Sequence, residues 1–130
     1  MTDVADSTIL RHTWLNRMSQ GFYRQGHDGL ASLDHSGRLC FCPLGAACEV
    51  FLDLGGVLHV VEQYEIRFYE GERFVLPERV RQAFGFRSVR GDRNPPGDDV
   101  SISALNDRAK LSLPQIAAIV RKNLAAYFVD

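Results

Sequence analysis

The sequence has no apolar run close to the roughly 20 residues that a helix needs to cross a bilayer. Its polar, acidic start lacks the basic and apolar regions of a signal peptide. It has only three cysteines, an odd number that argues against the paired disulfide framework of a secreted domain. We therefore expect a cytoplasmic protein with reduced thiols and no association with membranes.

An excess of charge of one sign is also missing. Fifteen basic residues face sixteen acidic ones, which gives a net charge of −1. A near-neutral chain has no overall attraction to nucleic acid, so we do not expect nucleic acid as its partner. Among the basic residues only Lys110 and Lys122 are lysine. Arginine suits phosphate and carboxylate binding, but a GC-rich genome produces the same bias, and we favour that explanation.

Sequence signatures that would name a reaction are absent too. The chain has no P-loop, no G-x-G-x-x-G after a strand, no H-E-x-x-H and no G-x-S-x-G. Its 130 residues, 45% of them hydrophobic, are enough for one domain whose core needs neither disulfides nor metal. We predict a flexible segment over residues 1–6, followed by a single domain over residues 7–130.

Hydrophobic periodicity predicts the elements of this domain. Apolar residues at helical spacing, with capping or terminating residues at the ends, mark four segments: 7–20, 43–54, 77–85 and a last helix from Ser112 whose buried stripe reaches Phe128. Strand candidates between turn residues are 30–33, 38–42, 57–61, 66–68 and 73–75. Three or four helices with two short hairpins predict an α+β domain.

All three cysteines lie within residues 40–48, which makes this segment the first candidate site. Pro43 favours the first turn of a helix, so Cys42 is expected at a helix N-terminus, where the pKa of a thiol is lowered. The same helix start would offer the N–H groups of Leu44 and Gly45 to an anion. Cys42 is then either an inert core residue or a nucleophile that needs a histidine base. The available bases are His27, His35 and His59. The cysteine spacing is poor for zinc, so we predict no metal site.

A glycine-punctuated loop before the first hairpin is the second candidate site. It carries Tyr23, Arg24, Gln25 and His27. These side chains can stack on a base or hydrogen-bond a phosphate. The alternative is that the aromatic residue packs over the core while the others are solvated.

The longest loop, residues 86–99, is the third candidate site. It contains Arg87, Arg90 and Arg93. Five arginines and a single aspartate lie between residues 79 and 93, a local positive charge that suits a nucleotide or an acidic partner. A solvated charged surface is the competing interpretation.

Four short motifs also occur in order between residues 14 and 124. They are Tyr23-Arg24-Gln25-Gly26, Cys42-Pro43-Leu44-Gly45 with Cys48, Leu76-Pro77-Glu78-Arg79-Val80 before Phe84-Gly85, and Leu105-Asn106-Asp107. In this order they resemble a group of small phage and bacterial proteins, most of them uncharacterised. A second cysteine is common in that group where this chain has Pro43. The resemblance implies a phage or prophage context and no particular activity. From the residues alone, we interpret Asn106 and Asp107 as turn or cap residues before the last helix, rather than as metal ligands.

Together these observations predict a small α+β binding module that holds a nucleotide-like anion or a host protein. The alternative is a cysteine-dependent enzyme with Cys42 as its nucleophile. We favour binding over catalysis and expect no cofactor. A homo-oligomer is compatible with the sequence.

Overall fold

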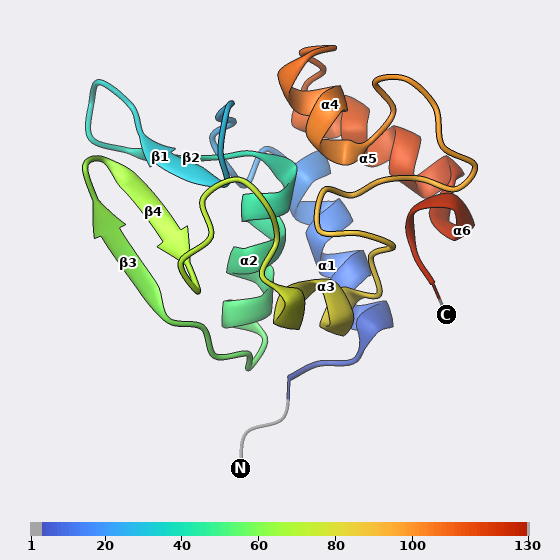
Figure 1. The fold of residues 1–130 in the computed structure, drawn as a ribbon, viewed down its shortest axis with the longest axis horizontal. Helices are drawn as coiled ribbons and strands as arrows, with labels where there is room; N and C mark the ends of the chain where they lie inside the picture. Colours follow the sequence, from blue (N-terminus) through green and yellow to red (C-terminus); the bar gives the residue numbers. More distant parts are fainter. Residues whose placement is uncertain (1–3, 130) are drawn as a thin grey trace.

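Ten helices and strands follow one another along the chain (Figure 1). The computed structural model describes residues 4–129, and its elements are α1 (Ser7–Ser19), β1 (Ala31–Leu33), β2 (Leu39–Phe41), α2 (Pro43–Asp53), β3 (Val60–Gln63), β4 (Ile66–Tyr69), α3 (Glu78–Phe84), α4 (Ile102–Asp107), α5 (Leu113–Lys122) and α6 (Leu124–Tyr127). The predicted α+β class is confirmed. None of the helices in residues 4–129 combines the length and the apolar character needed to span a bilayer.

The N-terminal segment differs from the flexible stretch expected there. Residues 1–3 lie outside the described residues. Ala5 is half-buried and donates its N–H to the carbonyl oxygen of Leu54 at 3.0 Å. Asp6, not Ser7 as expected, caps α1 by accepting a 3.0 Å hydrogen bond from a first-turn N–H. The start of the domain is therefore attached to the end of α2.

The two hairpins form one antiparallel sheet with the strand order β2-β1-β4-β3. The predicted hairpin around residues 34–37 is β1–β2, and β1 also pairs with β4. The second hairpin is β3–β4, and its turn is Tyr64-Glu65, both at positive φ. The strand expected at residues 73–75 does not form. This segment makes one 2.7 Å hydrogen bond, from the N–H of Leu30 to the carbonyl oxygen of Arg73, and then bends away from the sheet.

Helix α2 is the centre of the molecule and lies between the sheet and the other helices (Figure 1). Its first half is buried on all sides, as expected for a helix surrounded by other elements. Trp14 of α1 is also fully buried, and its indole N–H donates to the carbonyl oxygen of Pro43 at 2.8 Å. Phe84, Phe86 and Phe128 surround the Trp14 ring edge-on. These rings join the ends of the chain into one core.

The C-terminal part has two helices that the sequence pattern did not predict. The capping box of Ser112 and Gln115 forms as expected and starts α5. The helix ends at Asn123, whose φ of −134° is not helical, and the short α6 follows. Leu124, expected in the buried stripe, is therefore 45% exposed. Helix α4 occupies the region that was predicted as loop and turn.

Candidate functional site

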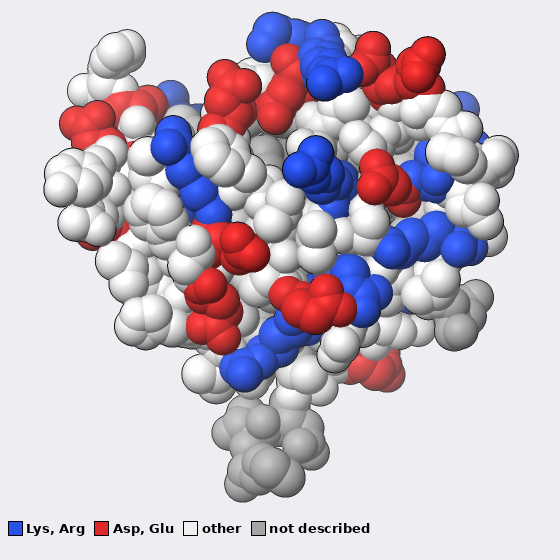
Figure 2. Space-filling view, viewed as in Figure 1, with Lys and Arg blue, Asp and Glu red and all other residues white. Residues whose placement is uncertain are grey.

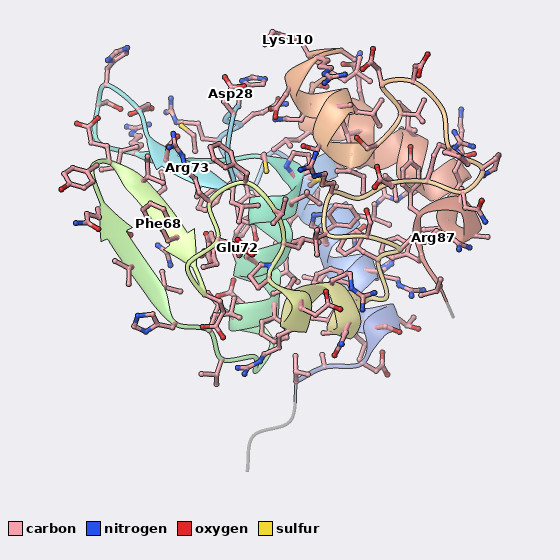
Figure 3. The ribbon with its side chains drawn as sticks, viewed as in Figure 1. Asp28, Phe68, Glu72, Arg73, Arg87 and Lys110 are labelled. Atoms are coloured by element: carbon pink, nitrogen blue, oxygen red, sulfur yellow. The ribbon has the colours of Figure 1, made fainter. Side chains whose placement is uncertain are left out.

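The end of α4 brings two of the three predicted regions together. The Asp107 carboxylate accepts the backbone N–H of Asp28 at 3.1 Å, which fixes the glycine-rich loop against α4. Asp107 also lines a cleft, and Arg90 from the third predicted region lines the same cleft. In Figure 3, Asp28 lies near the end of α4, whereas Arg87 lies apart from it, towards α6. The first predicted region, around Cys42, does not reach this cleft.

The cleft lies between α4 and the loop that precedes it and has a volume of about 290 Å³. That volume is at the lower end of the roughly 300–1,000 Å³ range of small-molecule sites. Its lining is polar and carries charges of both signs: Arg90, Asp92, Gly97, Asp99, Ser101, Ser103, Ala104, Asp107 and Arg108. Figure 2 shows acidic and basic side chains alternating over this face of the molecule.

Backbone contacts hold Arg90 at the cleft. The carbonyl oxygen of Arg90 accepts the N–H of Ser103 at 3.3 Å, and that of Gly91 accepts the N–H of Ile102 at 2.8 Å. Gly91 has a φ of +71°, and a Cβ there would lie 2.7 Å from the Ile102 side chain. A glycine is therefore required for the loop to approach α4 this closely.

The other charged groups of the cleft are already engaged. Arg108 forms an ion pair with Asp99 at 2.9 Å. The Asp92 carboxylate accepts the hydroxyl of Ser88 at 2.9 Å. Asp107 accepts both of its hydrogen bonds through Oδ1, from the Asp28 N–H and the Asn106 amide, which leaves Oδ2 as an open acceptor.

The guanidinium of Arg90 differs from these groups. Among residues 4–129 it has no ion-pair or hydrogen-bond partner. Arginine presents five N–H donors in a planar fork that fits a phosphate or carboxylate. Arg90 therefore gives the cleft an unsatisfied cationic donor next to open acceptors.

Ligand binding was predicted for the glycine-rich loop, but Tyr23 and Gln25 in this loop make contacts within the protein. The Tyr23 hydroxyl accepts a 2.9 Å hydrogen bond from Arg17, and its ring packs on Phe41. Burial raises the pKa of Tyr23, which keeps it neutral. The Gln25 amide donates at 2.7 Å both to the side-chain oxygen of Asn106 and to a backbone carbonyl before α5. Neither Tyr23 nor Gln25 is free for a ligand.

Two other residues of that loop remain exposed but lie outside the cleft. The Arg24 guanidinium is 3.3 Å from Asp34 in the first hairpin. The turn hydrogen bonds from Ser36 and Arg38, together with the charge of Arg24, lower the pKa of Asp34 to about 2. His27 is exposed and does not line the cleft. The loop and the cleft therefore do not form one continuous binding surface.

Cys42 caps α2, and its surroundings are those of the inert core residue rather than of the alternative, a nucleophile. Its sulfur accepts the N–H of Gly45 at 3.4 Å, and the thiol is 6% exposed. Burial outweighs the helix N–H groups and raises the pKa of the thiol to about 12, rather than lowering it. Leu44 and Gly45 are buried as well, so the start of α2 has no room for an anion. The lowered thiol pKa that suggested a cysteine-dependent enzyme is therefore not found at Cys42.

Labelling with iodoacetamide at neutral pH tests the two alternatives for Cys42. Burial raises the pKa of all three thiols, to about 12 for Cys42. Cys48 is fully buried, whereas Cys40 on the sheet is 7% exposed. We expect Cys40 to react first, and Cys42 and Cys48 only as fast as the protein unfolds, because the thiolate is the reacting form. Mass spectrometry of labelled peptides over time provides the rates. Fast modification of Cys42 in the folded protein would restore the enzyme hypothesis.

The arginines of the longest loop separate into different environments. Arg87 donates to the carbonyl oxygen of Ala125 at 2.8 Å and is a structural contact with α6. Arg93 lies with its guanidinium 5.8 Å from the ring centroid of Tyr127 and lines a neighbouring cavity. Only Arg90 of the three lines the cleft beside α4.

Several cleft residues were missed by the sequence analysis, namely Ser101, Ser103, Asp107 and Arg108. Ser101 is the N-cap of α4, with its hydroxyl accepting the N–H of Ala104 at 3.1 Å. A serine before Ile102 and Leu105 was the available signal for this helix. Within residues 4–129 no three acidic, cysteine or histidine side chains are arranged to hold a metal ion.

Comparison with known proteins adds no family to this description. No family model, curated protein or solved structure matches the chain.

Proposed function

We propose that this protein is a binding module for a small anionic ligand of the nucleotide type, and that the cleft beside α4 is its site. The observation that carries the proposal is the Arg90 guanidinium, which lines the cleft without a partner among the described residues. An anionic group would give it the charge-assisted hydrogen bonds that the protein does not supply.

The rest of the lining restricts the ligand. Ser103 also lines the cleft, and its backbone N–H donates to the carbonyl oxygen of Arg90. The Ser103 hydroxyl can donate to a phosphate oxygen. Oδ2 of Asp107 and the Asp92 carboxylate can accept hydrogen bonds from hydroxyl or amino groups. A ligand with an anionic group and several donors therefore fits better than a simple anion. Nucleotides combine a phosphate with ribose hydroxyls and a base.

Thermal-shift measurements with AMP, GMP and cyclic AMP test this proposal. A ligand that binds only the native state raises the melting temperature. We expect at least one of these nucleotides to do so. Arg90→Gln should weaken its binding by about 10- to 100-fold, which corresponds to about 1.5–3 kcal/mol for a charged hydrogen bond. Because Arg90 is exposed, the unliganded variant should melt within a degree or two of the wild type.

Arg38→Gln is the matched control, because it removes the same charge from the exposed turn of the first hairpin, away from the cleft. It should bind the nucleotide like the wild type. If no nucleotide shifts the melting temperature, or if both variants lose the shift equally, the cleft is not a nucleotide site. A host protein would then be the better hypothesis.

A further inference from the structure

A second cavity adjoins the cleft on the other side of the loop. It has a volume of about 320 Å³ and shares Asp92, Gly97 and Ser101 with the first. Its remaining lining includes Arg93 and Val100. The two cavities are therefore neighbouring lobes on either side of one short wall, and each contains an arginine from the same loop.

Arg93 is held in its lobe by an aromatic ring rather than by a carboxylate. Its guanidinium lies 5.8 Å from the ring centroid of Tyr127, and the Tyr127 hydroxyl donates to the carbonyl oxygen of Val100 at 2.7 Å. The next residue, Asn94, is anchored through its N–H to the carbonyl oxygen of Ala126 at 2.8 Å. The position of Arg93 is thus determined by its contacts with α6.

The charge of Arg93 is not neutralised within the protein. No carboxylate among the described residues forms an ion pair with it, and its Nε is buried without a hydrogen-bond partner. Buried polar atoms in native proteins nearly always have a partner. Arg90 and Arg93 therefore each place at one lobe a guanidinium that has no ion-pair partner among the described residues, and that of Arg93 also interacts with the Tyr127 hydroxyl.

We infer that the ligand carries two phosphate groups, one for each lobe. This inference rests on the proposed function and specifies the class of nucleotide: one with two phosphates, either linked, as in ADP, or at opposite sides of the ribose, as in adenosine 3′,5′-bisphosphate. Arg90 binds the first phosphate and Arg93 the second. Gly97, Ser101 and Asp92 line both lobes between them, and the Asp92 carboxylate accepts a hydrogen bond from the Ser88 hydroxyl.

A small ligand fits better than a nucleic-acid strand. Acidic and basic side chains are interspersed over the face shown in Figure 2. The whole chain has a net charge of −1. A polyanion would meet as much repulsion as attraction along such a surface. A small ligand contacts only the lobes, where Arg90 and Arg93 can bind its phosphates and where the carboxylates of Asp92 and Asp107 can accept hydrogen bonds from its hydroxyl or amino groups.

Isothermal titration calorimetry with AMP, ADP and adenosine 3′,5′-bisphosphate tests the inference on the full-length protein. At least one two-phosphate ligand should bind about tenfold more tightly than AMP, as one additional charged hydrogen bond implies. Arg93→Gln should abolish this difference and leave the affinity for AMP unchanged. Arg93→Lys should retain part of it, because it keeps the charge. Arg90→Gln should weaken all three ligands, and the control Arg38→Gln none.

The outcomes separate the inference from the proposed function. If AMP binds through Arg90 and the two-phosphate ligands bind no more tightly, the second phosphate site is refuted while the proposed function stands. If Arg93→Gln keeps the preference for two phosphates, the inference is equally refuted. If none of the three nucleotides binds, the inference fails, and the proposed function fails with it when GMP and cyclic AMP also leave the melting temperature unchanged. A ten-nucleotide oligonucleotide that binds more tightly than either two-phosphate ligand would overturn the assignment to a small molecule.

Discussion

Gly45→Ala should destabilise the protein by about 3 kcal/mol or more, at the upper end of the cost of overpacking a core. A Cβ at Gly45 would lie 1.9 Å from the carbonyl oxygen of Leu30 and 2.6 Å from its carbonyl carbon. These are backbone atoms, and the same oxygen accepts the N–H of Cys42 at 3.1 Å. Relief of the clash would have to move α2 away from Leu30, the residue directly before β1. That movement would open the centre of the core.

Urea denaturation of Gly45→Ala and of Gly21→Ala measures this effect against a matched control. Gly21 has a φ of +70° and no atom within 4 Å of an added Cβ. Its substitution should cost only the about 1–2 kcal/mol of a left-handed backbone conformation. Equal costs for the two variants would mean that α2 does not approach residue 30 as closely as described.

Asn106→Asp should have an effect of similar size, about 3–5 kcal/mol at neutral pH, as for an unpaired buried charge. Asn106 is the one buried polar residue of the core among the described residues. Its amide nitrogen donates to the oxygen of Gly26 at 2.9 Å and to Asp107 at 2.8 Å. A carboxylate at this position would replace the donor with an oxygen that faces two other oxygens. Only the bond from Gln25 would remain favourable.

The loss in Asn106→Asp should depend on pH. Burial and the facing oxygens disfavour the ionised carboxyl, so its pKa in the folded protein lies above the unfolded value of about 3.9. The folded state then binds the proton more tightly. Stability relative to the wild type should therefore fall as the pH rises from about 4 through the folded-state pKa. Urea titrations at several pH values measure this slope.

Asn16→Asp is the control for the same chemical change. The Asn16 side-chain oxygen accepts a hydrogen bond from Arg121 at 2.8 Å, so a carboxylate there would gain an ion pair. Asn16 is only half-buried, so this variant should unfold within about 0.5 kcal/mol of the wild type, as is usual for substitutions at the surface. A comparable loss in both variants would show that the Asn106 network does not stabilise the fold.

Elements whose signals are local were predictable from the sequence. The capping box at Ser112, the turn residues 34–37 and the Pro43 start of α2 each act through neighbours in the chain. The turn of the β3–β4 hairpin was not predicted, because Tyr64-Glu65 has positive φ at two residues that rarely adopt it. The interruption at Asn123 was missed for a similar reason, since the apolar spacing continues across it to Phe128.

The candidate sites show why side-chain type alone is a weak guide to function. Gln25 was expected to bind a ligand, but it contacts Asn106, which is 81 residues away in the chain. Cys42 was expected at a helix N-terminus, which lowers the pKa of a thiol, but burial raises the pKa of Cys42 instead. In both cases the decisive factor is a tertiary environment that spacing does not reveal. The role of Arg90 stays a prediction.

The contact between Gln25 and Asn106 also joins two of the sequence motifs. The segments Tyr23–Gly26 and Leu105–Asp107 are connected by two side-chain hydrogen bonds, and Gln25 donates a further one to the carbonyl oxygen of Leu111 before α5. These residues position α4, and α4 forms one wall of the cleft. The first motif therefore supports the site without lining it, whereas Asp107 of the second motif lines the cleft itself.

A heteronuclear NMR titration with AMP, GMP and cyclic AMP tests the central claim most directly, because it locates binding as well as detecting it. For at least one of the three, the account predicts saturable shifts confined to the amides that line the cleft, above all Arg90, Ser101, Ser103 and Asp107, and their loss in Arg90→Gln. Saturable shifts centred on the glycine-rich loop at residues 23–27, or no shifts with any of the three at millimolar concentration, would contradict it.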